Sequence, residues 1–478
     1  MAASGPDPAP PPVRAHRALP PALAALCVGG VGIAAWPYAV DDAWVIARYA
    51  RRIVGGLGYT FVDGPPTDGV TGPLGLVPAL VAEALAGEPI LGQKLAGLAA
   101  TMVSAAWATA VAGREAPRAG VVTACLLALW PLLGVWSVAG LETGLATLAC
   151  TAAGVGLLAR RGALLGGAVA ALAWLRPEAA PACLVALALH TRAAGRGAGP
   201  AWALALAGAA SVLAFRLAMF GALLPTSLAA KPPDLGHGLE YAARAFLVVL
   251  GVFGVLPLAL ATREPTRREL ALVLAVHACA VVLAGGDWMP GFRLFVPWLP
   301  AAALVMAGPI AARLDERRRL RGVALLAGAT LVPLVAGVVA IGDAREAGAT
   351  RDTAGRALAE HLATHARRVA LLDVGYVGFA TGLDVVDLGG ITDPRIARLP
   401  GGHADKAIDP GELAARDPDA LVLSSRIAPV VGADGRLRRF AGHPVEARVA
   451  AFAWVRESMR VTYVAPYGPR SYYVVLSR

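Results

Sequence analysis

The sequence carries little charge for its length. Of its 478 residues only 16% are charged and 57% belong to the apolar set, whereas soluble globular domains carry about 25% charged residues. Apolar runs of about 20 residues recur from Ala18 to Ile341, and each is long enough to cross a bilayer core of about 30 Å. The composition therefore excludes an ordinary soluble protein and predicts a polytopic α-helical membrane protein.

Three further absences narrow the function. All five cysteines fall inside apolar runs, so the sequence predicts no disulfide framework. The glycine-rich stretch 55–72 lacks the Lys-Ser/Thr ending of a nucleotide phosphate loop. The net charge of +10 does not indicate a nucleic-acid partner, because most arginines lie in short loops between apolar runs, where they set membrane orientation.

Composition divides the chain into three parts. Residues 1–18 form a Pro-rich tail, residues 19–342 form the membrane domain, and residues 343–478 carry charge, turn signals and short strand-like runs. In the last part we expect a helix over Thr353–Arg367 and four strands. The expected strands are Val369–Asp373, Val385–Leu388, Leu421–Ser424 and Tyr472–Leu476. A small C-terminal α/β soluble domain therefore follows the membrane domain.

The short basic loops predict the orientation. Basic residues near membrane spans mark the cytoplasmic side, and the loops around Arg114, Arg160, Arg192, Arg267 and Arg313 can all be cytoplasmic together. This places the N-terminus in the cytoplasm and residues 343–478 in the periplasm of a bacterial inner membrane. It requires about eleven spans, with the apolar segment Pro73–Leu85 re-entrant or lying on the surface. Whether residues 73–88 cross stays open at this stage.

The first outer loop, residues 41–72, begins with an amphipathic segment. Helical spacing places Val45, Ile46 and Tyr49 on one side and Arg48, Arg51 and Arg52 on the other. Such a helix lies on a membrane surface. Its arginines either contact membrane lipid head groups or hold the phosphate of a ligand, to which a guanidinium group binds bidentately.

Two adjacent acids, Asp41 and Asp42, begin this helix. They are either an N-cap and a first-turn acid that favour the helix dipole, or they include a general base for an acceptor hydroxyl. Side chains of adjacent helical residues point about 100° apart. We therefore expect only one of the two carboxylates to face the acceptor.

Taken in order, the motifs resemble the GT-C class of membrane glycosyltransferases, and most of all the bacterial terminal arabinofuranosyltransferase group. The motifs are the paired acids, the Arg-bearing helix, Thr71-Gly-Pro-Leu74, Gly140-Leu-Glu142-Thr143, Arg176-Pro-Glu178, Leu224-Pro-Thr-Ser227 with Lys231, Gly286-Asp287-Trp288 with Arg293, and Asp387-Leu-x-Gly390-x-Thr392-Asp393. They run from about Asp41 to Asp393. Val70-Thr71-Gly72 departs from the pattern, in which an aromatic residue precedes the threonine and a larger polar residue follows it.

The resemblance implies a reaction and roles. A polyprenyl-phosphate sugar would be the donor, and a cell-envelope glycan, lipid or protein would be the acceptor. Asp41 would be the general base, with Asp42 beside it in the catalytic pair. The residues implied for the donor phosphate are Arg48, Arg51, Arg52, Lys231 and Arg293. Those implied for positioning the acceptor are Thr71, Glu142, Arg176, Glu178 and Asp287, and Asp42, Glu142 and Asp287 would position acceptor hydroxyls or a divalent cation. The metal requirement is left open, and no other cofactor is implied.

Two other functions compete with this one. A lipid-linked sugar flippase or transporter would show repeated halves and ionisable residues near mid-membrane, and the sequence shows its acids at outer span ends and no evident repeat. A non-catalytic envelope assembly factor is the second alternative, and no residue pattern separates it from an enzyme.

Overall fold

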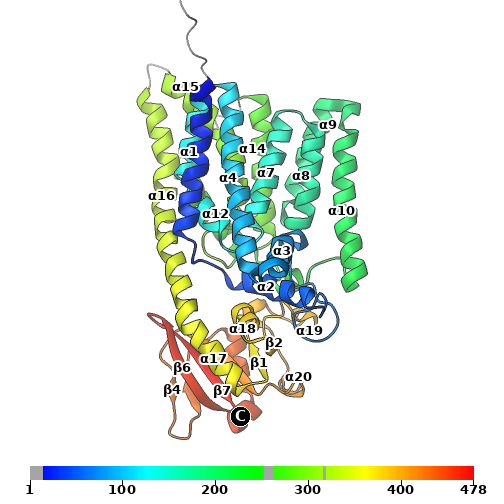
Figure 1. Ribbon diagram of the computed structural model, residues 1–478, viewed down its shortest axis with the longest axis vertical. Coiled ribbons are helices and arrows are strands. Elements are labelled where there is room, and N and C mark those ends of the chain that lie inside the picture. The colour runs from blue at the N-terminus through cyan, green and yellow to red at the C-terminus, as the bar shows by residue number, and fades with distance from the viewer. Residues whose placement is uncertain (1–13, 252–262, 316–318) are drawn as a thin grey trace, which may run out of the picture.

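The computed structural model describes residues 14–251, 263–315 and 319–478, so most of the predicted tail lies outside the described residues. A helical bundle occupies one part of the molecule, and a small α/β domain lies at one end of it (Figure 1). The bundle helices are α1 (Arg14–Ala34), α4 (Pro89–Glu115), α5 (Pro117–Ala128), α6 (Leu132–Ser137), α7 (Thr143–Leu158), α8 (Gly162–Leu175), α9 (Ala180–Ala194), α10 (Gly199–Phe220), α12 (Leu235–Leu250), α14 (Pro265–Leu283), α15 (Leu299–Asp315) and α16 (Arg319–Thr350).

Several bundle helices have the length and composition of membrane spans. Within the described residues, four helical segments are long and apolar enough to cross a bilayer: Pro89–Glu115, Pro177–Phe220, Val296–Leu314 and Arg319–His365. On α16 the large apolar side chains of Leu331, Val335 and Val338 are exposed, as expected for a surface covered by lipid. The protein is therefore a multi-pass membrane protein, and the number of about eleven spans stays a prediction.

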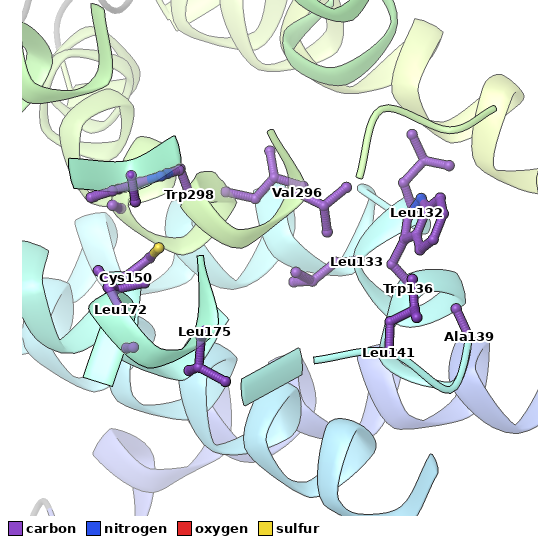
Figure 2. Packing of buried hydrophobic residues seen from close by; sticks show 14 of the residues in the cluster. Leu132, Leu133, Trp136, Ala139, Leu141, Cys150, Leu172, Leu175, Val296 and Trp298 are labelled. Atoms are coloured by element: carbon purple, nitrogen blue, oxygen red, sulfur yellow. The ribbon is translucent and has the colours of Figure 1, made fainter. Parts of the chain in front are cut away.

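Small residues bring the bundle helices into backbone contact. A Cβ atom on Gly144 of α7 would lie 2.3 Å from the carbonyl oxygen of Gly97 on α4, so these helices pack as closely as glycine allows. Figure 2 shows the apolar packing around α6 and α7, where Leu141, Leu175 and Val296 belong to one buried cluster. Leu141 and Leu175 directly precede Glu142 and Arg176, so this cluster anchors two charged residues of the site described below.

The end of the bundle nearest the C-terminal domain carries its own short elements. They are α2 (Asp41–Val54), the 3-10 turns η1 (Pro73–Leu76) and η2 (Pro177–Ala179), α3 (Val77–Ala86), α11 (Thr226–Ala230) and the 3-10 turn η4 (Val296–Trp298). The helices α2 and α3 lie beside each other at this end and not along the bundle (Figure 1). The segment 73–86 therefore forms the turn η1 and the short helix α3, which packs against the following helix α4.

The C-terminal domain contains a five-stranded mixed sheet in the order β2-β1-β3-β7-β6. Its strands are β1 (Arg368–Leu371), β2 (Asp384–Asp387), β3 (Ala420–Ser425), β6 (Arg460–Gly468) and β7 (Ser471–Ser477), and β4 (Val430–Val431) pairs separately with β5 (Leu437–Arg439). β1 pairs in parallel with β2 and with β3. β7 pairs antiparallel with β3 on one side and with β6 on the other. The helices of the domain are α17 (Arg356–His365), α18 (Val374–Thr381), α19 (Pro394–Ala397), α20 (Pro410–Ala415), α21 (Pro444–Ala451) and α22 (Ala453–Ser458), with a 3-10 turn η6 (His403–Asp405). All four expected strands are present as β1, β2, β3 and β7, and β4, β5 and β6 are additions.

A continuous helix joins the two parts. α16 runs into a π-helical turn, η5 (Arg351–Gly355), and then into α17, so one helical segment extends from the bundle into the C-terminal domain (Figure 1). The other connection is lateral: α18 packs against α2. The C-terminal domain is thus held against the loop-bearing end of the bundle from two sides.

Candidate active site

One cavity gathers eight of the twelve predicted site residues. It has a volume of about 430 Å³ and lies where α2, the loops at this end of the bundle and the C-terminal domain meet. We call it the polar cavity. The predicted residues that line it are Asp42, Thr71, Glu142, Arg176, Glu178, Lys231, Asp287 and Arg293. They come from segments far apart in the chain, which only the helical bundle brings together.

Arg176 forms a compact ion-pair group on one wall. Its Nη2 lies 3.1 Å from Oε1 of Glu142, and its Nη1 lies 3.3 Å from Oε1 of Glu178. It also donates a 3.0 Å hydrogen bond to the hydroxyl of Thr143. The side chains of Arg176 and Glu142 are each 8% exposed. Their charges therefore satisfy each other, because a buried charge is costly without a partner.

The turn at Thr71 packs directly on this wall. A Cβ atom on Gly72 would lie 2.4 Å from the carbonyl oxygen of Leu175, so the larger residue that the family pattern has after the threonine would not fit here. The hydroxyl of Thr71 lies 2.7 Å from that of Ser227 at the start of α11. The same turn is fixed by Arg216 of α10, which pairs with Asp68 at 2.9 Å and donates to the carbonyl of Thr71 at 2.6 Å.

Arg293 forms the opposite charged group. It pairs closely with Asp287, and its Nη1 lies 3.8 Å from Oδ2 of Asp42. Within the described part of the chain, Arg293 is the only charged partner within 4 Å of Asp42. The Asp42 side chain is 23% exposed and that of Asp287 is 5% exposed. Of these two acids, Asp42 is the one whose carboxylate remains accessible from the cavity.

Lys231 differs from the two arginines of the cavity. Its ammonium group lies 5.9 Å from the ring centroid of Trp288, and no ion pair is formed by Lys231 among the residues the structure describes. An ammonium group without a carboxylate partner can bind an anion without first giving up an ion pair. Lys231 is therefore the cation of this cavity best placed to receive a phosphate group.

Asp41 faces away from the polar cavity. Its carboxylate accepts hydrogen bonds from the backbone N–H groups of Gly375, at 2.7 Å, and Tyr376, at 2.8 Å. These groups belong to the first turn of α18, so Asp41 satisfies the unpaired donors of that helix. Burial raises the pKa of Asp41 to about 6, against the two hydrogen bonds, which lower it. The expectation that one of the paired acids faces the acceptor thus points to Asp42.

The three arginines of α2 also lie outside the polar cavity. Arg48 donates to the carbonyl groups of Phe61, at 2.7 Å, Gly378, and Leu383, at 2.7 Å. Arg51 pairs with Glu83 and lies over the ring of Phe379, and Arg52 pairs with Asp63 and donates to Thr60. Their donors are used to hold the outer loop and α18 in place.

The C-terminal domain contributes one wall through the loop after β2. Asp387 accepts hydrogen bonds from the backbone of Gly389, Gly390 and Thr392, at 2.8, 2.9 and 2.7 Å. Its role in the described structure is to form this turn. The turn directs Ile391 into the polar cavity. Neither Ile391 nor the Asp68–Arg216 pair was singled out from the sequence, although an arginine inside the apolar run of α10 is a known signal of function.

A second, apolar cavity adjoins the polar one. It has a volume of about 260 Å³ and lies between α12, α14 and the start of α15, where Phe246, Leu274, His277, Phe295 and Trp298 line it. Leu294 lines the polar cavity, and the next residue, Phe295, lines the apolar cavity. The two cavities therefore meet the chain at neighbouring residues. No group of three or more His, Cys, Asp or Glu side chains within residues 14–251, 263–315 and 319–478 is placed to hold a metal ion.

The structure is thus a helical membrane bundle with charged loop residues around a cavity and a small α/β domain against that end. The fold is similar to that of ArnT from Cupriavidus metallidurans, in a crystal structure bound to undecaprenyl phosphate, with a TM-score of 0.58 and 12% sequence identity. The similarity covers 94% of this chain and 96% of ArnT. The apo state of the same protein gives a TM-score of 0.56 over the same coverage.

The sequence comparisons add one match. Residues 341–474 match a family model described as a domain of unknown function, DUF8728. No curated protein matches the sequence. The similarity of fold to ArnT supports the GT-C fold that the sequence resemblance implies, and it does not support the arabinofuranosyltransferase group in particular.

Proposed function

We propose that this protein is a membrane glycosyltransferase that transfers a sugar from a polyprenyl-phosphate donor to a cell-envelope acceptor. The observation that carries the proposal is one cavity lined by an accessible carboxylate, Asp42, and by the ammonium group of Lys231, which forms no ion pair with the described residues. An apolar cavity begins at Phe295, the residue after Leu294 of the polar cavity. Glycosyl transfer from a lipid phosphate needs these three features: a base, a phosphate site and a place for the lipid.

Asp42 is the proposed general base. It would accept the proton of an acceptor hydroxyl as the oxygen attacks the anomeric carbon of the donor. The bond between that carbon and the phosphate oxygen breaks, and the products are a glycoside and a polyprenyl phosphate. Glu142 and Asp287 are less suited to this role, because both are nearly buried and held in ion pairs.

Lys231 is the proposed binding group for the phosphate. The cation would bind the donor phosphate already in the ground state, and because the negative charge of the phosphate grows as the sugar leaves, it would also stabilise the transition state. Arg293 and Arg176 would add to the positive field while remaining paired with their acids. Thr71 and Glu178 would position the acceptor, and the isoprenoid chain next to the phosphate would lie in the apolar cavity.

A transfer assay tests this proposal. Purified full-length protein in nanodiscs would be supplied with radiolabelled polyprenyl-phosphate pentoses and hexoses, arabinofuranose among them, and with envelope acceptors. We expect labelled sugar on an acceptor, lost in Asp42→Asn and preserved in Asp63→Asn, an exposed acid of the same loop. Movement of intact donor across the membrane without transfer would indicate a flippase. If no donor gives either sugar transfer or movement across the membrane, the proposal is contradicted.

We further propose that the C-terminal domain is outside the cytoplasmic membrane. The structure has the basic loops, such as that between α9 and α10, at the opposite end of the bundle from this domain (Figure 1), and basic loops favour the cytoplasm. In spheroplasts, Ser458→Cys in the exposed part of the domain should react with an impermeant thiol reagent, and Ala194→Cys at the opposite end should react only after lysis. The reverse pattern would overturn the orientation.

A further inference from the structure

A third cavity lies at the junction of the bundle and the C-terminal domain, beside the first turn of α2. It has a volume of about 370 Å³, and we call it the junction cavity. Its lining residues are Ala39, Asp41, Trp44, Glu346, Ala347, Thr350, Arg351, Gly355, Tyr376, Tyr467 and Tyr473. Asp41 lines this cavity and Asp42 lines the polar cavity, so the two cavities lie on different sides of the same helical turn.

Aromatic rings form much of its surface. The rings of Tyr467 and Tyr473 stack, with centroids 4.1 Å apart. On the other side, Trp44 and Tyr376 meet edge to face at 5.1 Å. Aromatic side chains that combine an apolar face with a polar edge suit ligands of the same mixed character. Sugars are such ligands, because a pyranose or furanose ring presents C–H groups on its faces and hydroxyl groups around its rim.

The polar groups of the junction cavity also suit a sugar. The lining carries two carboxylates, Asp41 and Glu346, and one guanidinium group, Arg351. The indole N–H of Trp44 is buried and has no hydrogen-bond partner among the described residues, although buried polar groups are normally paired. The excess of acid over base disfavours a phosphate or an anionic lipid head group, and the two carboxylates can accept hydrogen bonds from hydroxyl groups.

The helix that forms one wall is irregular at this position. Arg351 and Gly355 belong to the π-helical turn η5, and single π-helical turns within α-helices occur frequently at functional sites. A Cβ atom on Gly355 would lie 3.2 Å from the Tyr376 ring. The turn therefore brings α16 and α17 close to the aromatic residues of the cavity.

We propose that the junction cavity is a carbohydrate-binding site that holds uncharged sugar residues of an oligosaccharide acceptor, at a distance from the residue that is glycosylated. The inference rests on the proposed function for the identity of the acceptor. It deepens that function, because it makes the acceptor a glycan of several residues. Asp41 then contributes to acceptor binding and to the α18 contact, and Asp42 to the chemistry.

A binding measurement without donor tests this site. Full-length protein in nanodiscs would be titrated with maltohexaose, xylohexaose and chitohexaose, and with glycerol 1-phosphate as a head-group probe, and binding would be followed by saturation-transfer NMR. We expect Tyr467→Ala to weaken hexasaccharide binding by about tenfold, the equivalent of one aromatic contact. Tyr467→Phe keeps the ring and should stay within about threefold of wild type.

A tyrosine of the same strand supplies the control. Tyr463 of β6 stacks on His361 outside the junction cavity, so Tyr463→Ala should leave binding unchanged. The inference would be overturned if no hexasaccharide binds, if Tyr467→Ala and Tyr463→Ala weaken binding equally, or if glycerol 1-phosphate alone binds. Because no donor is present, a protein inactive in transfer can still pass this test, and an active enzyme can still fail it.

Discussion

The two sides of α2 carry similar charges and use them differently. On the side of the polar cavity, Asp42 has one distant charged partner and a side chain open to the cavity. On the side of the C-terminal domain, Asp41 accepts from the first turn of α18 and Arg48 donates to the carbonyl groups at its end. On the polar-cavity side the carboxylate of Asp42 is open to a ligand, whereas on the other side Asp41 and Arg48 are hydrogen-bonded to the backbone of residues 375–383.

We propose that this difference separates residues that act on the substrate from residues that mainly hold the C-terminal domain in place. A carboxylate that already accepts two backbone N–H groups cannot take up a proton without weakening those bonds. An arginine that donates to three carbonyl groups has few donors left for a phosphate. The comparison therefore predicts that substitutions on the cavity side reduce catalysis and substitutions on the domain side reduce stability.

The largest effect is expected for Asp42→Asn. Loss of a general base costs about 10²–10⁴-fold in rate, and the variant should fold because the amide keeps the size of the carboxylate. Asp41→Asn should retain turnover within about tenfold, since its change acts through α18 and not on the reacting hydroxyl. Turnover at matched protein levels checks both. Equal losses in the two variants would remove the distinction between the two sides of α2.

The second effect is expected for Lys231→Met. A phosphate contact formed in the ground state is lost, so the donor KM should rise by about tenfold to a hundredfold with a smaller fall in kcat. Arg52→Met is the matched control, because it removes a cation that lies outside the polar cavity. A donor KM that responds to Arg52 and not to Lys231 would move the phosphate to the other side of α2.

A third effect concerns stability. Arg48→Met removes hydrogen bonds from a charged donor to three carbonyl groups, and should lower the free energy of unfolding of the C-terminal domain by about 2 kcal/mol. Arg51→Met should change it by less than about 0.5 kcal/mol, because its salt bridge is partly exposed. Thermal unfolding in nanodiscs and proteolysis of the domain would measure the change. Loss of turnover per folded Arg48→Met molecule would contradict a structural role.

The smallest effect is a pH dependence. The pKa of Asp41 is raised in the folded protein, mainly by burial, from an ordinary value of 3.8 to about 6. A raised carboxyl pKa means that the folded state binds the proton more tightly, so stability is highest below about pH 4 and falls as the pH rises towards 6. We expect a fall of about 1 kcal/mol, since the group is only half-buried, and Asp41→Asn should abolish this contribution. An identical slope in both proteins would contradict it.

Much of the architecture is readable from the sequence because it depends on local pattern. Apolar runs predict the helical bundle, and the strand-like runs from Val369 onward predict the C-terminal sheet. The loop residues Glu142, Arg176, Asp287 and Arg293 were predicted as a group because they all follow or precede apolar runs on one side of the deduced membrane. Their convergence on one cavity follows from that shared side.

The different contacts of the acidic and basic residues of α2 could not be predicted in the same way. Asp41 and Arg48 are fixed by backbone groups of residues 375–383, more than 300 positions away in the sequence. The period of the helix shows that Asp41 and Asp42 point apart, but not which of them meets α18. The same holds for Ile391, whose place in the polar cavity depends on how the C-terminal domain packs against α2.

The central claim is that a lipid phosphate binds in the polar cavity and not at the arginines of α2. A cryo-electron microscopy structure of the full chain in nanodiscs with undecaprenyl phosphate would measure its position directly. The account predicts phosphate density within hydrogen-bonding distance of Lys231, with the isoprenoid chain extending into the cavity lined by Phe295 and Trp298. Phosphate density at Arg51 or Arg52, with the polar cavity empty, would contradict it.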